Sequence, residues 1–446
     1  MSLLRSPKEV DQLAFSCADG QQLAADHAER TPLATRWQQT VDSTCLFRRA
    51  VLRRLSNLQS GKLRILDRSG AFEFGDVSKS QLSATIDVHN RRFYRAVALG
   101  GSLAAAESFI RGDWDSPDLT VTMRVLAQNM DVLAGVERGM ARLLRPLRFA
   151  GNWFRRNTRS GSKRNIAAHY DLRNEFFELM LDPTMTYSSG VFPSPQTTLE
   201  GASIEKYDRI CRKLQLQPED HVVEIGTGWG GFAEHAVTKY GCRVTTTTIS
   251  NEQHAYALCR FRNLGIADRI TLLKQDYRDL CGRFDKLVSI EMIEAVGEKF
   301  LPSYFAKCSE LLKSDGMMCL QAIIIPDHRY DCYRKSVDFI QRYIFPGGFL
   351  PSMGAMANCI GRGTDFRFLH LEDFGPNYAE TLSHWRQSFW QNIDAVSKLG
   401  FDRRFIRTWH YYLCYCEASF RERHIGVSQL VLAKPDCRRV SLMGIM

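Results

Sequence analysis

Residues 222–232, "VVEIGTGWGGF", run from an apolar stretch with strand character into a cluster of glycines. Glycine adopts backbone angles that other residues avoid, and it lets the main chain approach a ligand closely. A strand, a glycine turn and the helical pattern "GGFAEHAVTKY" in this order are typical of a nucleotide-binding α/β fold. The stretch therefore predicts a ligand site at the carboxyl end of this strand.

Strand and helix patterns alternate for more than one hundred residues around this turn. Strands are expected at 221–225, 242–249, 270–275, 284–292 and 317–325, and helices at 230–240, 251–265 and 302–316. Short apolar strands that alternate with helices predict a mostly parallel sheet covered on both faces. Ligands in such sheets bind where the strand order reverses, which is where the glycines are expected.

The remainder of the chain divides into segments of different character. We expect a poorly ordered segment at 1–40, a small α+β domain at 41–135, a basic linker at 136–164 and the main domain at 165–437. Within the main domain, the aromatic stretch 326–352 reads as a helical insertion with a glycine turn. It is either a lid over an apolar substrate or an ordinary packed cover.

The bulk composition favours a cytoplasmic protein with an anionic partner. The chain has 446 residues, 44% of them hydrophobic, and no apolar run approaches the roughly 18 residues that a membrane span needs. Thirteen cysteines are scattered without a disulfide or zinc pattern, so we expect reduced thiols and no metal site. A net charge of +10 favours an anionic surface as a partner.

The positive charge is concentrated in residues 138–164. This segment contains nine arginines and lysines and no acid, with leucines and aromatic residues interleaved. Such a mixture is typical of a segment that lies on an anionic membrane, although a solvated linker has a similar composition. Nucleic acid is not expected, because no nucleic-acid-binding motif accompanies the charge. The sequence predicts a peripheral location at the inner membrane face and leaves a homodimer open.

The cofactor is indicated by the acid before the glycines. A nicotinamide site would have an acid at the end of the second strand, where this chain reads "TTTTIS". Glu224 instead gives the pattern acid-x-Gly-x-Gly-x-Gly, which suits the ammonium and carboxylate groups of S-adenosylmethionine. The pattern favours methyl transfer, and a purely structural glycine turn remains the alternative.

Eight segments together resemble the cyclopropane-fatty-acyl-phospholipid synthases, which include the mycolic acid cyclopropane synthases. They lie between residue 165 and about residue 435, in the order of that family: "AAHYDLRNEFFELMLDPTMTYSSGVF", "EIGTGWGGFAEHA", "TTISNEQ", "QDYRDL", "KLVSIEMIEAVG", "YIFPGGFLPS", "FGPNYAETL" and "YYLCYCEASFRER". The resemblance implies a Rossmann-like S-adenosylmethionine methyltransferase fold. The first module is also similar to the amino-terminal domain of longer members.

The resemblance also implies a reaction. A cis double bond of a phospholipid acyl chain takes the methyl group of S-adenosylmethionine, a carbocation forms, and loss of a proton closes a cyclopropane ring. In the family a bound bicarbonate is thought to be the base. Such chemistry requires an apolar channel and an anionic base in a dry pocket.

Site residues follow by position from the same resemblance. The residues implied to bind the cofactor are Tyr187, Ser188, Glu224, Gly226, Gly228, Trp229, Gly230, Thr248, Gln253, Asp276 and Tyr277. The residues implied to hold the catalytic anion are Glu294, Tyr378, Gln321, Ser189 and Ile323, the last through its main chain.

Two of these positions depart from the family pattern. Ser189 stands where well-known members have cysteine, and Gln321 stands where they have histidine. Both side chains can still hydrogen-bond an oxyanion, but neither titrates near neutrality. The near alternative is therefore a cation that relaxes by a hydride shift to a methyl-branched or methylene chain. A methyltransferase for a small soluble molecule, or a lipid-binding protein without catalysis, are the more distant alternatives.

Overall fold

The computed structural model describes residues 43–131, 133 and 172–438. The segments expected to be poorly ordered (1–40) and basic (136–164) lie outside the described residues. Within the described ranges no helix combines the length and the apolar character that crossing a bilayer requires.

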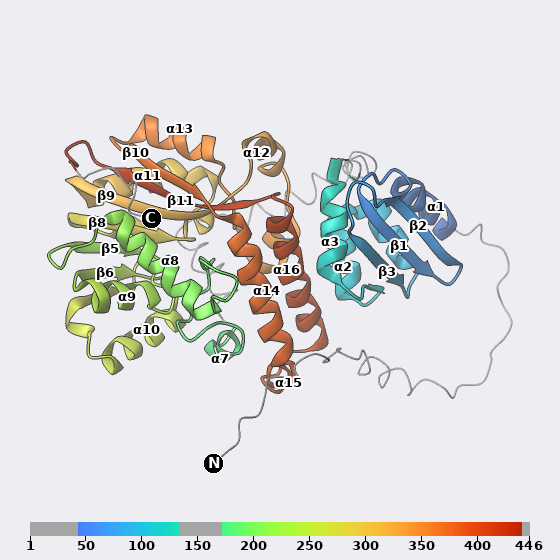
Figure 1. The fold of residues 1–446 in the computed structure, drawn as a ribbon, viewed down its shortest axis with the longest axis horizontal. Coiled ribbons are helices and arrows are strands. Elements are labelled where there is room, and N and C mark those ends of the chain that lie inside the picture. Colours follow the sequence, from blue (N-terminus) through green and yellow to red (C-terminus); the bar gives the residue numbers. More distant parts are fainter. Residues whose placement is uncertain (1–42, 132, 134–171, 439–446) are drawn as a thin grey trace, which may run out of the picture. The chain divides into compact units, whose positions relative to one another are not determined.

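The amino-terminal module is a small four-stranded sheet covered by helices (Figure 1). Its strand order is β2-β1-β3-β4, and β1 pairs antiparallel with β2 and parallel with β3. Its elements are α1 (Ser43–Leu55), β1 (Gly61–Asp67), β2 (Gly70–Asp76), β3 (Ser83–Val88), α2 (Arg92–Ile110), β4 (Trp114–Asp115) and α3 (Leu119–Gln128). The side chain of Asp118 accepts from the main-chain N–H of Val121 and caps the start of α3.

The second sheet has seven strands in the order β10-β11-β9-β8-β5-β6-β7 (Figure 1). Five neighbouring strands are parallel, and β11 and β10 add two antiparallel strands at one edge. The strands are β5 (His221–Ile225), β6 (Arg243–Thr247), β7 (Ile270–Leu273), β8 (Phe284–Ile290), β9 (Leu312–Ile324), β10 (Arg367–Asp373) and β11 (Gly426–Ala433). The Rossmann-like fold class is therefore confirmed.

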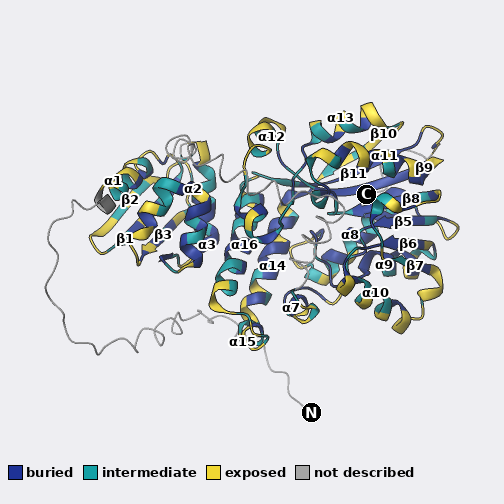
Figure 2. Ribbon diagram, turned by 180° about the vertical axis from the view of Figure 1, so that it is seen from behind, coloured by how far each residue is buried: buried dark blue, intermediate teal, exposed yellow. Residues whose placement is uncertain are grey.

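Alternating apolar residues bury both faces of this sheet, and the central strands are buried (Figure 2). Val222 packs with α8 and α9 on one face, whereas Val223 packs with α11 on the other. The helices of this domain are α7 (Asn174–Glu178), α8 (Leu199–Leu214), α9 (Gly231–Tyr240), α10 (Asn251–Asn263), α11 (Leu301–Leu311), α12 (Asp327–Tyr333), α13 (Met353–Gly363), α14 (Gly375–Gln391), α15 (Ile393–Lys398) and α16 (Arg403–Arg421). Short 3-10 turns follow β7 and β8, and one turn of π-helix spans Ile340–Ile344.

Two long helices that the sequence reading did not resolve, α14 and α16, pack against each other. Arg386 on α14 donates to the buried carboxylate of Glu417 on α16 at 2.9 Å, and Tyr378 stacks on Phe420. Arg124 on α3 pairs with Glu422 at the end of α16, so the amino-terminal module also contacts this helix. The packing of these two helices therefore fixes the position of Tyr378.

The insertion expected at 326–352 is helical, as the sequence indicated. It contains α12 and the π-helical turn, and Gly347 has a positive φ of 81°. The main-chain N–H of Phe349 donates to the carbonyl of Glu294 at 2.8 Å. This hydrogen bond links the insertion to the 3-10 turn that follows β8.

Candidate active site

A large cavity lies at the carboxyl ends of the parallel strands. Its volume is about 1060 Å³, at the top of the roughly 300–1,000 Å³ that is typical of ligand pockets. The glycine turn after β5 forms one wall, and aromatic side chains of the insertion and α16 form others, including Phe345, Phe349 and Tyr412. Apolar residues of the amino-terminal module, such as Met123, also line it. The cavity can hold a polar nucleoside at one end and an apolar chain beside it.

The glycine turn fits the methyl donor that the sequence implied. Gly228 has a φ of 54°, and a Cβ added to it would meet no atom within 4 Å, so the turn leaves open space on the cavity side. Gly230 has a φ of 93° at the start of α9, and an added Cβ would collide with the ring of Phe261 at 2.7 Å. The positive φ favours glycine at both positions, and at Gly230 the packing against Phe261 excludes a side chain as well.

Most of the residues implied to bind the cofactor line this cavity. The lining includes Tyr187, Ser188, Glu224, Gly226, Gly228, Trp229, Thr248, Gln253, Asp276 and Tyr277, whereas Gly230 lies behind it against α10. Some of these side chains also bind each other: Thr248 donates to Gln253 at 2.9 Å, and Asp276 accepts from Arg278 at 2.6 Å. The structure thus brings the implied cofactor residues to one place.

Two buried charges lie at the expected methionine end. Lys206 on α8 is fully buried, and its Nζ donates to Ser188 Oγ at 2.7 Å. Burial lowers the pKa of Lys206 to about 8, although the nearby carboxylates of Glu291, Asp182 and Glu224 oppose that shift. Burial raises the pKa of Glu224 to about 8, and its carboxylate accepts from Thr246 at 2.6 Å. Glu224 and Ser188 line the cavity, whereas Lys206 lies behind Ser188, so an amino acid in the cavity would meet Glu224 and Ser188 directly.

The residues implied to hold an anion surround a carboxylate of the chain itself. Glu291 follows β8 directly, and its Oε1 accepts from the main-chain N–H of Ser189 at 2.9 Å and from Gln321 Nε2 at 2.8 Å. Its Oε2 accepts from the hydroxyl of Tyr378 at 2.7 Å. We call these three donors, Ser189 N–H, Gln321 Nε2 and Tyr378 O–H, the donor cage.

The sequence reading placed the Ser189 hydroxyl at the anion, and the structure differs there. The hydroxyl donates to the carbonyl of Gly190 at 2.9 Å, so Ser189 contributes its main chain to the donor cage. Ser189 and Gln321 are fully buried behind Glu291, and neither is among the residues that line the cavity. Glu291, Glu294, Ile323 and Tyr378 do line it.

Glu294 lies one turn beyond Glu291, in the 3-10 turn Ile293–Ala295. One carboxylate oxygen accepts from the main-chain N–H of Ile323, which the resemblance implied as a contact of the bound anion, and the other is buried with no hydrogen-bond partner among the described residues. Burial, followed by the charge of Glu291, raises the pKa of Glu294 to about 8. The unpartnered oxygen is available to a group in the cavity.

The sequence reading missed Glu291, Lys206 and the residues behind Gln321. Glu291 had a usable signal, because an acid directly after an apolar strand lies at the ligand-binding edge of a parallel sheet. Its φ of 48° is unusual for a residue other than glycine and marks a position under constraint. Lys206 had a weaker signal, a lysine within an amphipathic helix that the structure buries completely.

Known proteins resemble this chain in sequence and in fold. Residues 157–430 match the model of the mycolic acid cyclopropane synthetase family. The chain is 40% identical to the tuberculostearic acid methyltransferase UfaA1 of Mycobacterium tuberculosis over 347 residues, which cover 76% of this chain and 81% of the relative. It is 35% identical to the cyclopropane-fatty-acyl-phospholipid synthase of Escherichia coli K12 over 355 residues, which cover 79% of this chain and 88% of the relative.

A solved structure agrees with these matches. The mycolic acid cyclopropane synthase CmaA1, in complex with SAH and CTAB, superposes with a TM-score of 0.57 at 31% identity and covers 61% of this chain and 98% of its own. This chain is therefore an S-adenosylmethionine-dependent methyltransferase and belongs to the mycolic acid cyclopropane synthetase family.

Proposed function

We propose that the protein transfers the methyl group of S-adenosylmethionine to a carbon of the cis double bond in an unsaturated phospholipid acyl chain. The observation that carries this proposal is the cavity, in which the glycine turn, three buried carboxyl groups and aromatic walls meet. When bound, S-adenosylmethionine supplies an electrophilic methyl group on a positively charged sulfur. The names of both curated relatives, a fatty-acid methyltransferase and a phospholipid cyclopropane synthase, support an acyl substrate.

The residues of the chain have distinct tasks in this proposal. Glu224 and Ser188, whose hydroxyl Lys206 holds from behind, orient the charged amino-acid end of the donor, and Tyr277 and Asp276 lie toward its nucleoside end. Phe345, Phe349 and Tyr412 exclude water from the acyl chain, which protects the carbocation from hydration. The carboxylates near the donor cage stabilise that cation and take its proton.

Two products are consistent with this arrangement. In the first, proton loss from the added methyl group closes a cyclopropane ring, as the name of the Escherichia coli relative implies for that enzyme. In the second, a hydride shift precedes proton loss and gives a methylene branch, C=CH2, on the chain. A saturated methyl branch would require a two-electron reductant in addition.

The proposal is tested with vesicles of monounsaturated phospholipid and methyl-labelled S-adenosylmethionine. We expect label in the acyl chains, and mass spectrometry with proton resonance then identifies a ring or a methylene group. Vesicles of saturated phospholipid are the matched control and should remain unlabelled. Absence of label from unsaturated lipid, with the donor still bound in calorimetry, would contradict the proposal.

We also propose that the basic segment 136–164, which lies outside the described residues, brings the protein to the inner face of an anionic membrane. Its nine cationic side chains are the support for this step. In the same assay the rate on anionic vesicles should fall as salt rises, because salt screens exposed charges. A rate that does not depend on salt would remove the membrane role. Bicarbonate as base stays a prediction from the resemblance, and a homodimer stays open.

A further inference from the structure

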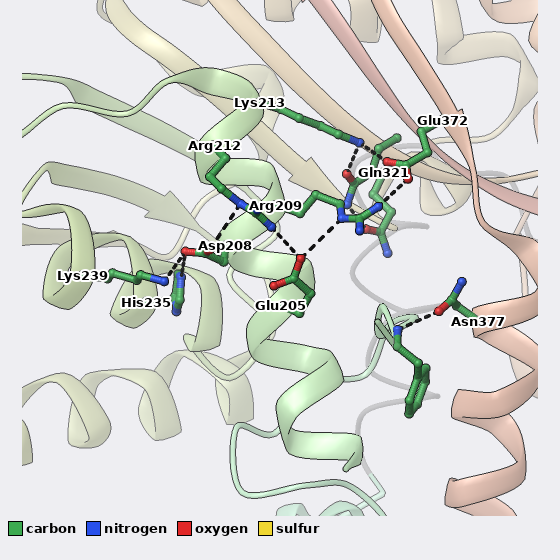
Figure 3. Close-up of polar contacts among 12 residues, drawn as sticks. Glu205, Asp208, Arg209, Arg212, Lys213, His235, Lys239, Gln321, Glu372 and Asn377 are labelled. Carbon is green, nitrogen blue, oxygen red and sulfur yellow. Dashed lines mark hydrogen bonds and ion pairs between the residues drawn. The ribbon is translucent and has the colours of Figure 1, made fainter. Parts of the chain in front are cut away.

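The orientation of the donor cage is fixed by a chain of buried side chains. Lys213 is 1% exposed, and its Nζ donates to Oε1 of Gln429 at 2.7 Å. Figure 3 shows Lys213 between Glu372 and the side chains that lead to Gln321. A lysine ammonium can only donate, so Gln429 must turn its oxygen toward Lys213 and its NH2 group away.

The next link in this chain is the amide of Gln321. Nε2 of Gln429 donates to Oε1 of Gln321 at 3.0 Å, so the Gln321 amide must point its own NH2 group toward Glu291. The antiparallel register of β11 and β9 places Gln429 directly opposite Gln321. The cation of Lys213 thus fixes the orientation of the Gln321 amide and makes its NH2 group a donor at the site.

The donor cage therefore selects a group that accepts hydrogen bonds. Ser189 N–H can only donate, Gln321 is fixed as a donor, and the Tyr378 hydroxyl donates at 2.7 Å. An ionised carboxylate accepts on both oxygens, whereas a protonated carboxyl must use one oxygen as a donor. Glu291 meets the cage as a carboxylate.

The neighbouring acid differs in this respect. Glu294 receives one main-chain hydrogen bond, from Ile323, and its other oxygen has no partner among the described residues. Two buried carboxylates that lie close together resist carrying two charges, and the one with more donors keeps the charge. Burial raises the pKa of both groups, but the three donors oppose this shift at Glu291. The negative charge of the pair is therefore on Glu291.

We propose that the carboxylate of Glu291 is the base of the reaction and occupies, as a built-in group, the place for which the family resemblance implies an external bicarbonate. This inference rests on the proposed function, because the proton it removes comes from the methyl group added to the acyl chain. Glu291 is among the residues that line the cavity in which that chain would lie.

The step balances without another reactant. After the methyl group is added, the acyl chain carries one positive charge. One C–H bond of the new methyl group breaks, and the proton goes to an oxygen of Glu291. The electron pair of that bond forms the third side of the ring, or a C=C bond if a hydride has first shifted. The cation and the carboxylate thus become a neutral lipid and a neutral carboxyl group.

The test variant is Glu291→Gly. The backbone of Glu291 has a φ of 48°, which glycine adopts without strain, so this change preserves the local fold and empties the donor cage. We expect turnover to fall about 100-fold or more, the lower end of a general-base contribution. Bicarbonate or formate should then restore about 10-fold or more, because the three donors remain. Wild-type turnover should be the same in bicarbonate-free buffer.

Two further variants separate a chemical role from a structural one. In Glu291→Gln the side chain still fills the donor cage, so we expect the same loss of turnover and no response to either anion. Gln215→Gly at the end of α8 is the matched control, because Gln215 also has a positive φ, 52°, and is not among the cavity-lining residues. It should behave as the wild type does.

A binding measurement gives a readout that does not depend on catalysis. Carbon resonance with labelled bicarbonate, in the absence of the methyl donor, should detect a bound anion in Glu291→Gly and none in the wild type or in Glu291→Gln. An anion bound at the wild-type site, or wild-type turnover that requires bicarbonate, would overturn the inference. Full turnover of Glu291→Gly without any anion would overturn it as well. Failure of the wild type to label lipid would instead refute the proposed function.

Discussion

Glu224, Glu291 and Glu294 bring three buried carboxyl groups to one cavity, and Lys206 is the buried cation beside them. Each has a different set of partners. Glu224 accepts from a threonine hydroxyl, and Glu291 accepts from the three donors of the cage. Glu294 accepts from one main-chain N–H, and Lys206 donates to a serine hydroxyl. Burying ionisable groups costs free energy unless they are paired or change their protonation state. A protein retains such a cluster where the charges act on a ligand.

The protonation of Glu294 predicts how stability depends on pH. Its pKa is raised from 4.5 to about 8 in the folded protein, so between these values the folded state keeps a proton that the unfolded state has released. The free energy of unfolding therefore falls as pH rises, by up to about 1.4 kcal/mol per pH unit for one group. Glu294→Gln removes this contribution, and its stability should fall less steeply between about pH 5 and pH 8.

Urea unfolding at several pH values measures this slope. Glu200→Gln is the control, because Glu200 lies exposed in the first turn of α8. It should keep the wild-type slope. Equal slopes for the wild type and Glu294→Gln would show that Glu294 is already ionised near neutrality.

Individual residues of the site could be named from the sequence only where a familiar pattern existed. Glu294, Tyr378 and Ile323 follow from the resemblance, and all three line the cavity. Glu291 did not follow, because the resemblance implies a free anion where this chain supplies a carboxylate of its own. The orientation of the Gln321 amide depends on Lys213, more than one hundred residues away, and no local pattern encodes it.

At the scale of elements, the alternation of strands and helices was sufficient to predict the central sheet. The five parallel strands lie where apolar stretches were expected, although β9 begins at Leu312, earlier than expected. The antiparallel strands β10 and β11 were missed. The apolar run of β11, buried along almost its whole length, was a usable signal, whereas β10 is largely exposed and gave little.

The antiparallel strand β11 matters to the site because it supplies Gln429. Replacing this residue by glutamate keeps its size and gives Lys213 a carboxylate, but the new group can no longer donate to Gln321. The Gln321 amide should then turn its oxygen toward Glu291 and break the donor cage. We expect Gln429→Glu to lower turnover about 10-fold or more, the usual cost of losing a hydrogen bond to a charged group.

The affinity for S-adenosylmethionine should stay at the wild-type value in this variant, because the substitution does not change the residues that line the cofactor part of the cavity. A loss of turnover with unchanged affinity in calorimetry therefore indicates loss of the base, whereas a loss of both indicates misfolding of the site. Gln387→Glu, on the exposed face of α14, is the matched control and should change neither quantity. Wild-type turnover in Gln429→Glu would contradict the orientation argument.

At the scale of the whole molecule, the fold class and the family could be predicted from the sequence, and both are confirmed. The boundaries at 41–135, 136–164 and 165–437 stay predictions, since the basic segment lies outside the described residues. The extent of the cavity could not be predicted, because its walls come from the glycine turn, the 326–352 insertion, α16 and the amino-terminal module. Only the folded chain brings these segments together.

The most direct measurement uses S-adenosylmethionine with a fully deuterated methyl group and monounsaturated phospholipid vesicles. Mass spectrometry of the acyl chains counts the deuterium atoms that remain on the added carbon. If a base in the cavity removes a proton from the transferred methyl group, the product keeps two of the three deuterium atoms, whether it is a ring or a methylene group. A product that keeps all three, or one without label, would contradict the account.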